Sequence, residues 1–258
     1  MIKTILFYTA FWALIAVSFP VALVASVFYN LGFTDQTRAF LHKAARLWAR
    51  LVIFMSGSTL TVTGMENIPA DVGVCFVGNH QGDFDTLICL AVFGRPFGFT
   101  AKKEAIYLPV VGLWVVLLGG VFIDRKSARR AYASIVAAAE QVRRGFSMVI
   151  FPEGRRSRGE AMGTFKGGAF KLATLAEAPV VPFTIDKSYK VWEEHKRIRS
   201  TQLGIRFHPA IPTAGLDADG KRALPERVRS VIASTQATEA VQAVQAVQAV
   251  QGAQGARG

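Results

Sequence analysis

The longest uncharged stretch of the chain runs from Thr4 to Thr34 and is almost entirely apolar. A helix needs about 20 apolar residues to cross the hydrocarbon core of a bilayer, so this stretch is long enough to do so. Pro20 interrupts it near the middle, which leaves two interpretations: one kinked span, or two short helices that enter and leave the same leaflet. We therefore predict a membrane anchor over residues 1–34.

Basic and apolar residues alternate at helical spacing from Arg38 to Met55. This pattern predicts an amphipathic helix within residues 35–57, which can lie on anionic lipid or pack on the core of the following domain. Lys and Arg also outnumber Asp and Glu directly after the apolar stretch. By the positive-inside rule, we expect the remainder of the chain on the cytoplasmic side of the cell (inner) membrane.

After residue 58, short apolar runs alternate with stretches of helical periodicity. This alternation is typical of an α/β domain in which helices cover both faces of a sheet, and we assign it to residues 58–235. The predicted strands are Ser58–Thr63, Val74–Val77, Val121–Ile123, Ser147–Phe151, Val180–Ile185 and Leu203–His208.

Three further segments complete the prediction. The uncharged run Ala105–Leu118 is expected to form a buried helix, because glycines and a proline interrupt this region too often for a membrane span. Lys187–Arg199 is rich in basic residues, so we expect it to be exposed. Residues 236–258 form a low-complexity tail, in which Ala-Val-Gln repeats are followed by Gly and Ala.

Charge and composition narrow the classes of partner. The chain has a net charge of +12 and is 51% hydrophobic, a combination that favours an anionic membrane surface or phosphorylated substrates over nucleic acid. It contains no zinc-finger spacing and no RNA-binding sheet signature, so we expect no nucleic-acid partner. Cys75 and Cys89 lie in apolar runs, where we expect buried thiols rather than a disulfide, as in a reducing cytoplasm.

The segment Asn79–Asp85, with the sequence NHQGDFD, follows a predicted strand and contains an H-x-x-x-x-D pair. Neutral imidazole accepts protons near pH 7, so His80 could deprotonate a hydroxyl while Asp85 holds the ring in one tautomer. Five residues of α-helix would leave the two side chains roughly 140° apart, so they meet only if His80 lies in a turn before the helix, which Gly82 permits. The alternative is a solvated loop histidine beside acids that cap a helix.

Two other predicted strands are followed by cations, at Arg125 and in the turn Glu153–Arg156. Ligands of open α/β sheets gather beyond the carboxyl ends of the strands, so these side chains and His80 are expected to share one site. Guanidinium groups bind phosphate through paired hydrogen bonds, and His80 needs a hydroxyl to deprotonate. A molecule with a hydroxyl near a phosphate, handled beside a membrane, is a glycerophospholipid precursor.

These residues lie in blocks that resemble the glycerolipid acyltransferase family, and within it most closely the 1-acylglycerol-3-phosphate O-acyltransferases (lysophosphatidate acyltransferases). The matching blocks are NHQGDFD at Asn79–Asp85, GGVFIDR at Gly119–Arg125, FPEGRRS at Phe151–Ser157 and VVPFTI at Val180–Ile185. The resemblance implies the fold of that family, a mixed α/β sheet flanked by helices with an N-terminal membrane-embedded helical segment.

The resemblance also implies an activity: transfer of an acyl group from acyl-CoA or acyl-carrier protein to the 2-hydroxyl of lysophosphatidate, giving phosphatidate. His80 would be the general base and Asp85 its partner, the hydroxyl would attack the thioester directly, and no cofactor would be bound. The acceptor's glycerol phosphate would bind at Arg125, Glu153, Gly154 and Arg156, with Lys102 and Lys103 as further candidates.

Two alternatives remain open. Arg155 stands where the family usually has threonine, which could favour another acceptor: a lyso-ornithine lipid, another lysophospholipid or glycerol 3-phosphate. A catalytically silent scaffold on the membrane surface would be a protein of another class, although a scaffold has no need of His80 and Asp85. The sequence contains no G-x-S-x-G elbow, Walker A loop or H-E-x-x-H motif, which disfavours a serine lipase, a nucleotide hydrolase and a zinc enzyme.

Overall fold

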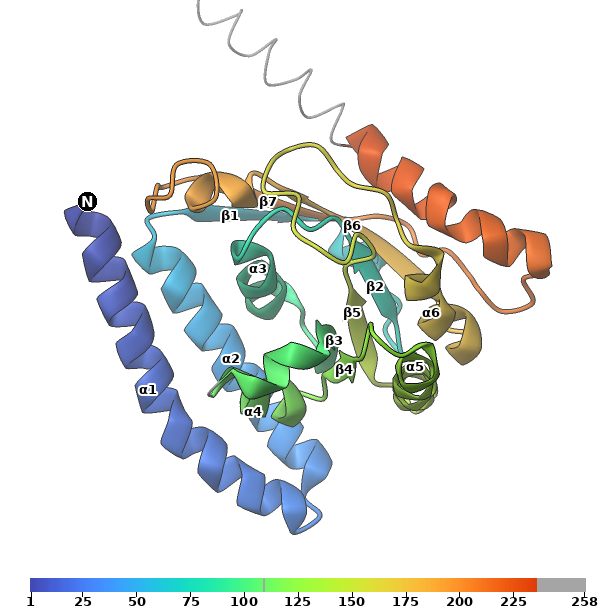
Figure 1. Ribbon diagram of the computed structural model, residues 1–258, viewed down its shortest axis with the longest axis horizontal. Coiled ribbons are helices and arrows are strands. Elements are labelled where there is room, and N and C mark those ends of the chain that lie inside the picture. The colour runs from blue at the N-terminus through green and yellow to red at the C-terminus, as the bar shows by residue number, and fades with distance from the viewer. Residues whose placement is uncertain (109, 236–258) are drawn as a thin grey trace, which may run out of the picture.

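The computed structural model describes residues 1–108 and 110–235 of the chain. These residues form a seven-stranded sheet in the order β1-β7-β6-β2-β5-β3-β4 (Figure 1). Neighbouring strands are parallel except β6 and β7, so the sheet is mixed, as predicted. The strands are β1 (Thr59–Thr63), β2 (Cys75–Gly78), β3 (Phe97–Lys102), β4 (Val121–Ile123), β5 (Ser147–Ile150), β6 (Val180–Asp186) and β7 (Gln202–Phe207).

Helices cover both faces of this sheet. They are α1 (Ile2–Asn30), α2 (Thr34–Met55), α3 (Phe84–Val92), α4 (Val111–Leu117), α5 (Ala128–Arg143), α6 (Lys171–Ala176) and a helix over 218–235. Short 3₁₀ helices are η1 (Met65–Asn67), η2 (Lys103–Tyr107), η3 (Gly167–Phe170) and η4 (Ser188–Val191). Figure 1 shows α5, α6 and the helix over 218–235 on one side of the sheet, and α1 to α4 on the other.

Strand β2 contributes to two separate cores, because successive side chains of a strand point to opposite faces. Cys75 and Val77 pack with α5 and α6, whereas Phe76 belongs to the core beneath α2 and α3. All three side chains are buried. Since both faces are covered, β2 is apolar throughout, and its polar continuation from Asn79 onward lies beyond the carboxyl edge of the sheet.

The first two helices lie side by side. α1 continues through Pro20, and α2 returns along it after a bend at Gly32, whose φ of 96° favours glycine (Figure 1). Within the described residues, α1 is the helix that is long and apolar enough to cross a membrane. α2 is amphipathic, as its pattern predicts, and packs on α3: Arg46 donates to the Phe93 carbonyl and Arg50 Nε to the Ala91 carbonyl at 3.0 Å.

The structure departs from the sequence prediction in three segments. The pattern does not predict β3, because its buried residues occur only at its start and show no alternation. The helix expected over Ala105–Leu118 is divided between η2 and α4, since a proline in this interval cannot donate the hydrogen bond that a continuous helix requires. Lys187–Arg199 is only partly exposed, because Ser188 and Val191 are fully buried. The predicted tail, 236–258, lies outside the described residues.

Candidate active site

His80 and Asp85 meet at the carboxyl end of β2. His80 lies in the turn after the strand, and Asp85 is in the first turn of α3. The distance from His80 Nδ1 to Asp85 Oδ2 is 2.6 Å. The Asp85 side chain is fully buried and that of His80 is 20% exposed, so the pair is closed to solvent on the acid side and open on the imidazole side.

Within the described residues, the Asp85 carboxylate accepts hydrogen bonds from three groups. Oδ2 accepts from His80 Nδ1 and, at 2.9 Å, from the Gly82 N–H, while Oδ1 accepts from the Ser188 hydroxyl. An ionised carboxylate only accepts, so a neutral imidazole in this contact carries its proton on Nδ1 and keeps the lone pair of Nε2. This tautomer is the one that a general base requires.

Contacts with the turn after β5 fix the orientation of His80. Its ring stacks on Phe151, with centroids 4.3 Å apart and planes inclined by 16°. Its backbone N–H donates to Glu153 Oε1 at 2.7 Å, and its carbonyl accepts from the Ser157 N–H at 2.8 Å. The FPEGRRS turn therefore holds both the ring and the backbone of the histidine.

Glu153 is a buried carboxylate that joins two loops. Its second oxygen, Oε2, accepts from the Gly163 N–H at 2.8 Å. Burial raises the pKa of Glu153, and the backbone hydrogen bonds that it accepts oppose this rise. Arg156, three positions further on, pairs with Asp83 instead, and its Nη1 lies 3.8 Å from Glu193 Oε1. Glu153 and Arg156 thus bind different partners and do not pair with each other.

Two cations approach the open side of Gly154. Arg125 Nη1 donates to the Gly154 carbonyl at 2.6 Å. A methyl group placed on Gly154 would lie 3.1 Å from Lys166 Nζ and 3.6 Å from Arg125 Nη1, and the φ of +69° at this position also favours glycine. The turn therefore brings two positive charges together at a position without a side chain, an arrangement suited to a phosphate group.

Lys102 and Lys103, at the end of β3, have acidic partners of their own. Lys102 Nζ lies 3.6 Å from Glu104 Oε2, and Lys103 Nζ lies 3.2 Å from Asp124 Oδ2. The structure therefore does not assign either lysine to the Gly154 turn. Among the described residues, no group of three or more His, Cys, Asp or Glu side chains is placed to hold a metal ion.

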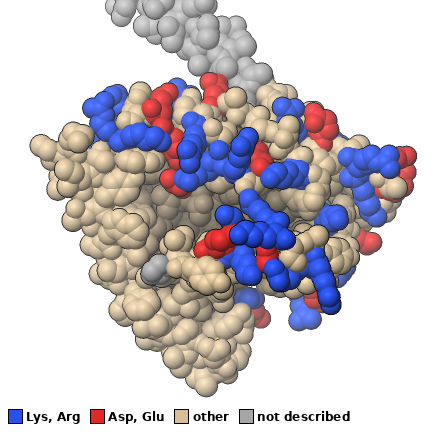
Figure 2. Space-filling view, in the orientation of Figure 1, with Lys and Arg blue, Asp and Glu red and all other residues tan. Residues whose placement is uncertain are grey.

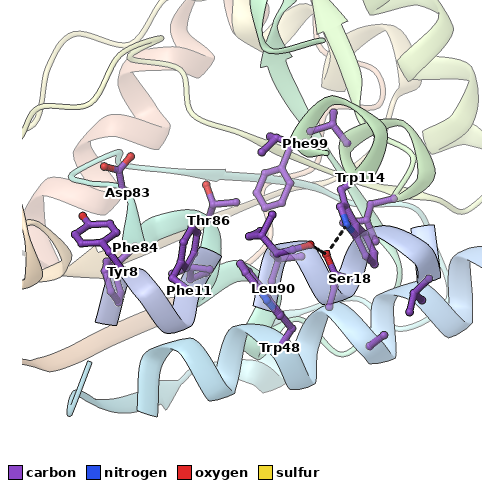
Figure 3. A pocket seen from close by; sticks show the side chains of 18 of the residues that line it. Tyr8, Phe11, Ser18, Trp48, Asp83, Phe84, Thr86, Leu90, Phe99 and Trp114 are labelled. Carbon is purple, nitrogen blue, oxygen red and sulfur yellow. Dashed lines mark hydrogen bonds between the residues drawn. The ribbon is translucent and has the colours of Figure 1, made fainter. Parts of the chain in front are cut away.

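An apolar cavity of about 470 Å³ lies next to the segment Asn79–Asp85, of which Asp83 and Phe84 line it. Its lining comes mainly from α1, α2, α3 and α4. Figure 3 shows that it is elongated, with Tyr8 and Asp83 at one end and Ser18 and Trp114 at the other, where Trp114 Nε1 donates to Ser18 Oγ at 3.2 Å. Its volume is typical of ligand pockets, and its shape and lining suit a hydrocarbon chain.

Comparisons with known proteins agree with this geometry. The sequence profile of the family described as "Acyltransferase" matches residues 59–186. The 1-acyl-sn-glycerol-3-phosphate acyltransferase of Borreliella burgdorferi is 32% identical over 188 residues, which cover 72% of this chain and 75% of that protein. The chain belongs to this acyltransferase family. The human 1-acyl-sn-glycerol-3-phosphate acyltransferase alpha is also 32% identical, over 72% of this chain and 67% of its own length.

A solved structure shows that the acyltransferase fold is shared. The crystal structure of the 1-acyl-sn-glycerophosphate acyltransferase PlsC from Thermotoga maritima matches with a TM-score of 0.74. The match covers 92% of this chain and 96% of that one, at 24% sequence identity. The fold predicted from the resemblance, a mixed sheet flanked by helices, is therefore confirmed.

The sequence pattern does not reveal three side chains of this acyltransferase site. Ser188 contacts Asp85, and Glu193 Oε1 accepts from the Asp83 N–H at 2.7 Å. Both come from a segment whose basic composition predicts exposure. Lys166, the third, lies in a glycine-bearing loop, and its glycines were the one local signal of a close backbone approach.

Proposed function

We propose that this acyltransferase moves a fatty acyl group from a thioester, either acyl-CoA or acyl-carrier protein, to the 2-hydroxyl of lysophosphatidate and so forms phosphatidate. Membership of the family supports the reaction and the acceptor. The contact between His80 and Asp85 carries the proposal, because it leaves His80 Nε2 free to act as a base next to an apolar cavity.

In the proposed step, His80 Nε2 removes the proton of the acceptor hydroxyl while the hydroxyl oxygen attacks the thioester carbonyl. The C–O bond forms, the C–S bond breaks and the thiolate leaves. The imidazolium, stabilised by Asp85, then gives its proton to the thiolate, so that the products are the ester and a free thiol. General-base catalysis of this kind contributes about 10²- to 10⁴-fold to the rate.

The phosphate of the acceptor would bind between Arg125 and Lys166. Four bonds separate phosphorus from the 2-hydroxyl oxygen in lysophosphatidate, so the phosphate lies only about 5 Å from the reacting atom. Gly154, which both cations approach, follows Glu153, whose carboxylate binds the backbone of His80. His80 and the two cations are thus linked through adjacent residues of one turn, which supports the assignment of the phosphate to Arg125 and Lys166.

Arg156 is better suited to positioning than to binding phosphate. Its guanidinium pairs with Asp83 and lies near Glu193, so carboxylates already offset its charge. Its neighbour Arg155 is exposed and stands where the family usually has threonine. This exposed cation favours a second candidate function, the same acyl transfer to an acceptor with another head group, such as a lyso-ornithine lipid or glycerol 3-phosphate.

The elongated cavity would hold the acyl chain of the donor, and the membrane would supply the acceptor. Figure 2 shows Lys and Arg side chains gathered over the α/β part of the molecule, and a surface without charged groups over α1. α1 exposes large apolar side chains, including Trp12, Val24 and Phe28. We place it in the membrane and the α/β domain on the cytoplasmic side.

The test is transfer of labelled acyl groups by the detergent-purified protein. Acyl-CoA and acyl-carrier protein serve as donors, and lysophosphatidate, lyso-ornithine lipid and glycerol 3-phosphate as acceptors. We expect wild-type protein to form phosphatidate and His80→Ala to lose about 10²- to 10⁴-fold in kcat. The matched control is His195→Ala, which removes an exposed histidine paired with Glu194.

Near wild-type turnover by a folded His80→Ala variant would falsify the assignment of the base. Transfer to another member of the acceptor panel would keep the chemistry and change the specificity. Silence of the wild-type protein with every donor and acceptor would favour the membrane-surface scaffold.

A further inference from the structure

A second cavity, of about 320 Å³, lies beyond the end of β4, and its charged side is organised by Asp124. Asp124 Oδ2 accepts from Arg130 Nε at 2.7 Å and lies 3.2 Å from Lys103 Nζ, while Oδ1 accepts from the Lys126 N–H at 3.0 Å. Hydrogen bonds from Lys126 and Lys103 lower the pKa of Asp124 to about 2. The carboxylate is therefore ionised at neutral pH and holds two cations at the cavity.

This cluster keeps the capacity to bind an anion. Two cations face one carboxylate, which leaves an excess of one positive charge. Asp124 occupies Nε of Arg130, so the two terminal nitrogens of the guanidinium have no partner among the described residues. Tyr107, which is 76% exposed, and Phe122 supply aromatic surface to the same cavity. A phosphate attached to a larger, partly flat group matches this combination.

The cluster lies on the same sheet edge as His80, three strands away. The paired positions of the parallel strands β2, β5, β3 and β4 form one row through Val77, Ile150, Thr100 and Val121. Three residues beyond that row on each strand stand His80, Glu153, Lys103 and Asp124. Neighbouring strands are about 4.8 Å apart, so the backbone of Asp124 is about 14 Å from that of His80 across the sheet, and the backbone of Lys103 is about 10 Å from it.

Lys103 and Arg130 are held on Asp124, whereas Arg125 of the same loop reaches the Gly154 carbonyl, so this cluster is separate from the proposed site for the acceptor phosphate. The separation of about 14 Å between Asp124 and His80 calls for a longer ligand. It matches the donor, because the pantetheine arm has the length of four to five extended residues, roughly 15 Å, between the thioester sulfur and the phosphate that ends the arm. Building on the proposed acyl transfer, we propose that Lys103 and Arg130 bind the phosphate at the distal end of the donor's pantetheine arm, beside Tyr107.

Two sources supply this phosphate, coenzyme A and the prosthetic group of acyl-carrier protein, and a set of donors separates them. KM and kcat would be measured with acyl-CoA, acyl-carrier protein and S-acyl-pantetheine, which has the same arm without phosphate. Arg130→Gln is expected to raise KM for a phosphate-bearing donor about tenfold, or about 1.4 kcal/mol, because it removes a hydrogen bond between two charged groups. KM for S-acyl-pantetheine and for lysophosphatidate should not change.

The matched control is Arg129→Gln, which removes the same charge from the adjacent position on α5, outside the cavity lining. An equal rise in the donor KM in both variants would show only a general attraction of anions to the basic surface and would overturn the site. A raised KM for lysophosphatidate, or no change with any donor, would also overturn it. An effect with acyl-CoA alone, or with acyl-carrier protein alone, would support the site and name the source.

Direct binding separates this site from the proposed function. Calorimetric titration of wild-type and Arg130→Gln protein with coenzyme A needs no turnover. Weaker binding to the variant would support the site even if the acyl transfer itself were not found. Equal binding to both proteins, together with equal kinetics for acyl-carrier protein, would overturn the site while leaving the activity intact.

Discussion

A single hydroxyl, that of Ser188, supports Asp85, the acid of the proposed catalytic pair. Burying a carboxylate costs free energy unless its oxygens are hydrogen-bonded, and Asp85 is fully buried. The Ser188 hydroxyl donates to Oδ1, and Gln81 Oε1 accepts from the Ser188 N–H at 3.2 Å, which fixes the serine. Ser188 thus acts on His80 only through Asp85, as a positioning residue.

Ser188→Ala is expected to lower kcat about 10- to 100-fold, because a hydrogen bond to a charged group contributes about 1.5–3 kcal/mol. KM for donor and acceptor should remain near the wild-type values, since Ser188 belongs to neither proposed binding site. Ser188→Thr keeps the hydroxyl and should recover much of the lost turnover. Steady-state kinetics of the three proteins provide the measurement. Equal kcat in all of them would show that the hydroxyl has no role in positioning.

Contacts in the candidate site could be predicted from the sequence where the two partners are close along the chain, and not where they are distant. His80 and Asp85 are five positions apart, so the pair could be predicted from local spacing and from the glycine between them. Ser188 lies 103 positions from Asp85, and Glu193 lies 110 from Asp83. No local sequence pattern marks Ser188 or Glu193 as a site residue, because only the path of the chain after β6 brings them to the loop Asn79–Asp85.

Strands could be predicted from the sequence where they are buried on both faces, because burial then requires an apolar residue at nearly every position. β2, β5 and β6 are covered on both faces and appear as continuous apolar runs, which the sequence analysis recognised. β3 is buried only at its start, and its exposed end carries Lys102. The order of the strands and the antiparallel direction of β7 depend on pairing between distant segments, which periodicity does not encode.

The helices α1, α2 and α4 together determine the length of the elongated cavity. Ala44, on α2, lines it one helical turn before Trp48. Ala44→Leu is expected to shorten the acyl chain that fits. The specificity constant kcat/KM for long-chain donors should fall about 10- to 200-fold, while that for short-chain donors should not change.

A series of donors of increasing chain length measures this effect. Leu47→Phe, on the exposed side of the same helix, adds volume outside the cavity and serves as the control. A uniform loss at every chain length in Ala44→Leu would indicate damage to the fold instead of a shorter cavity. An unchanged preference would remove the cavity from the acyl-binding site.

The whole molecule constrains how α1 meets the membrane. With 29 residues, α1 is about 44 Å long, more than the hydrocarbon thickness of a bilayer. Contacts with the rest of the chain follow its full length: Lys3 Nζ donates to Ser200 Oγ at 2.8 Å near the start, and Tyr29 OH accepts from Arg38 at 3.0 Å near the end. A helix held in this way cannot cross the bilayer without drawing α4 and part of the α/β domain into the hydrocarbon.

We therefore expect α1 and α2 to lie in a single leaflet. This placement is that of the second interpretation of the sequence, but the two short helices of that interpretation are wrong, because α1 is one helix that continues through Pro20. Ile2→Cys and Leu31→Cys, at the two exposed ends of α1, would be treated with a membrane-impermeant maleimide in sealed vesicles of both orientations. The native Cys75 and Cys89 are buried and should not react.

A spanning α1 would place its two ends on opposite faces, so that Leu31→Cys is labelled from the side opposite to Ile2→Cys. A helix confined to one leaflet gives no labelling of Leu31→Cys from that opposite side, because hydrocarbon of the far leaflet covers it. Labelling in a non-denaturing detergent, in which Cys75 and Cys89 stay buried, shows that the introduced thiol of each variant is reactive. Reaction of the two ends from opposite faces would contradict the single-leaflet arrangement and require the contacts of α1 with Ser200 and Trp114 to open in the membrane.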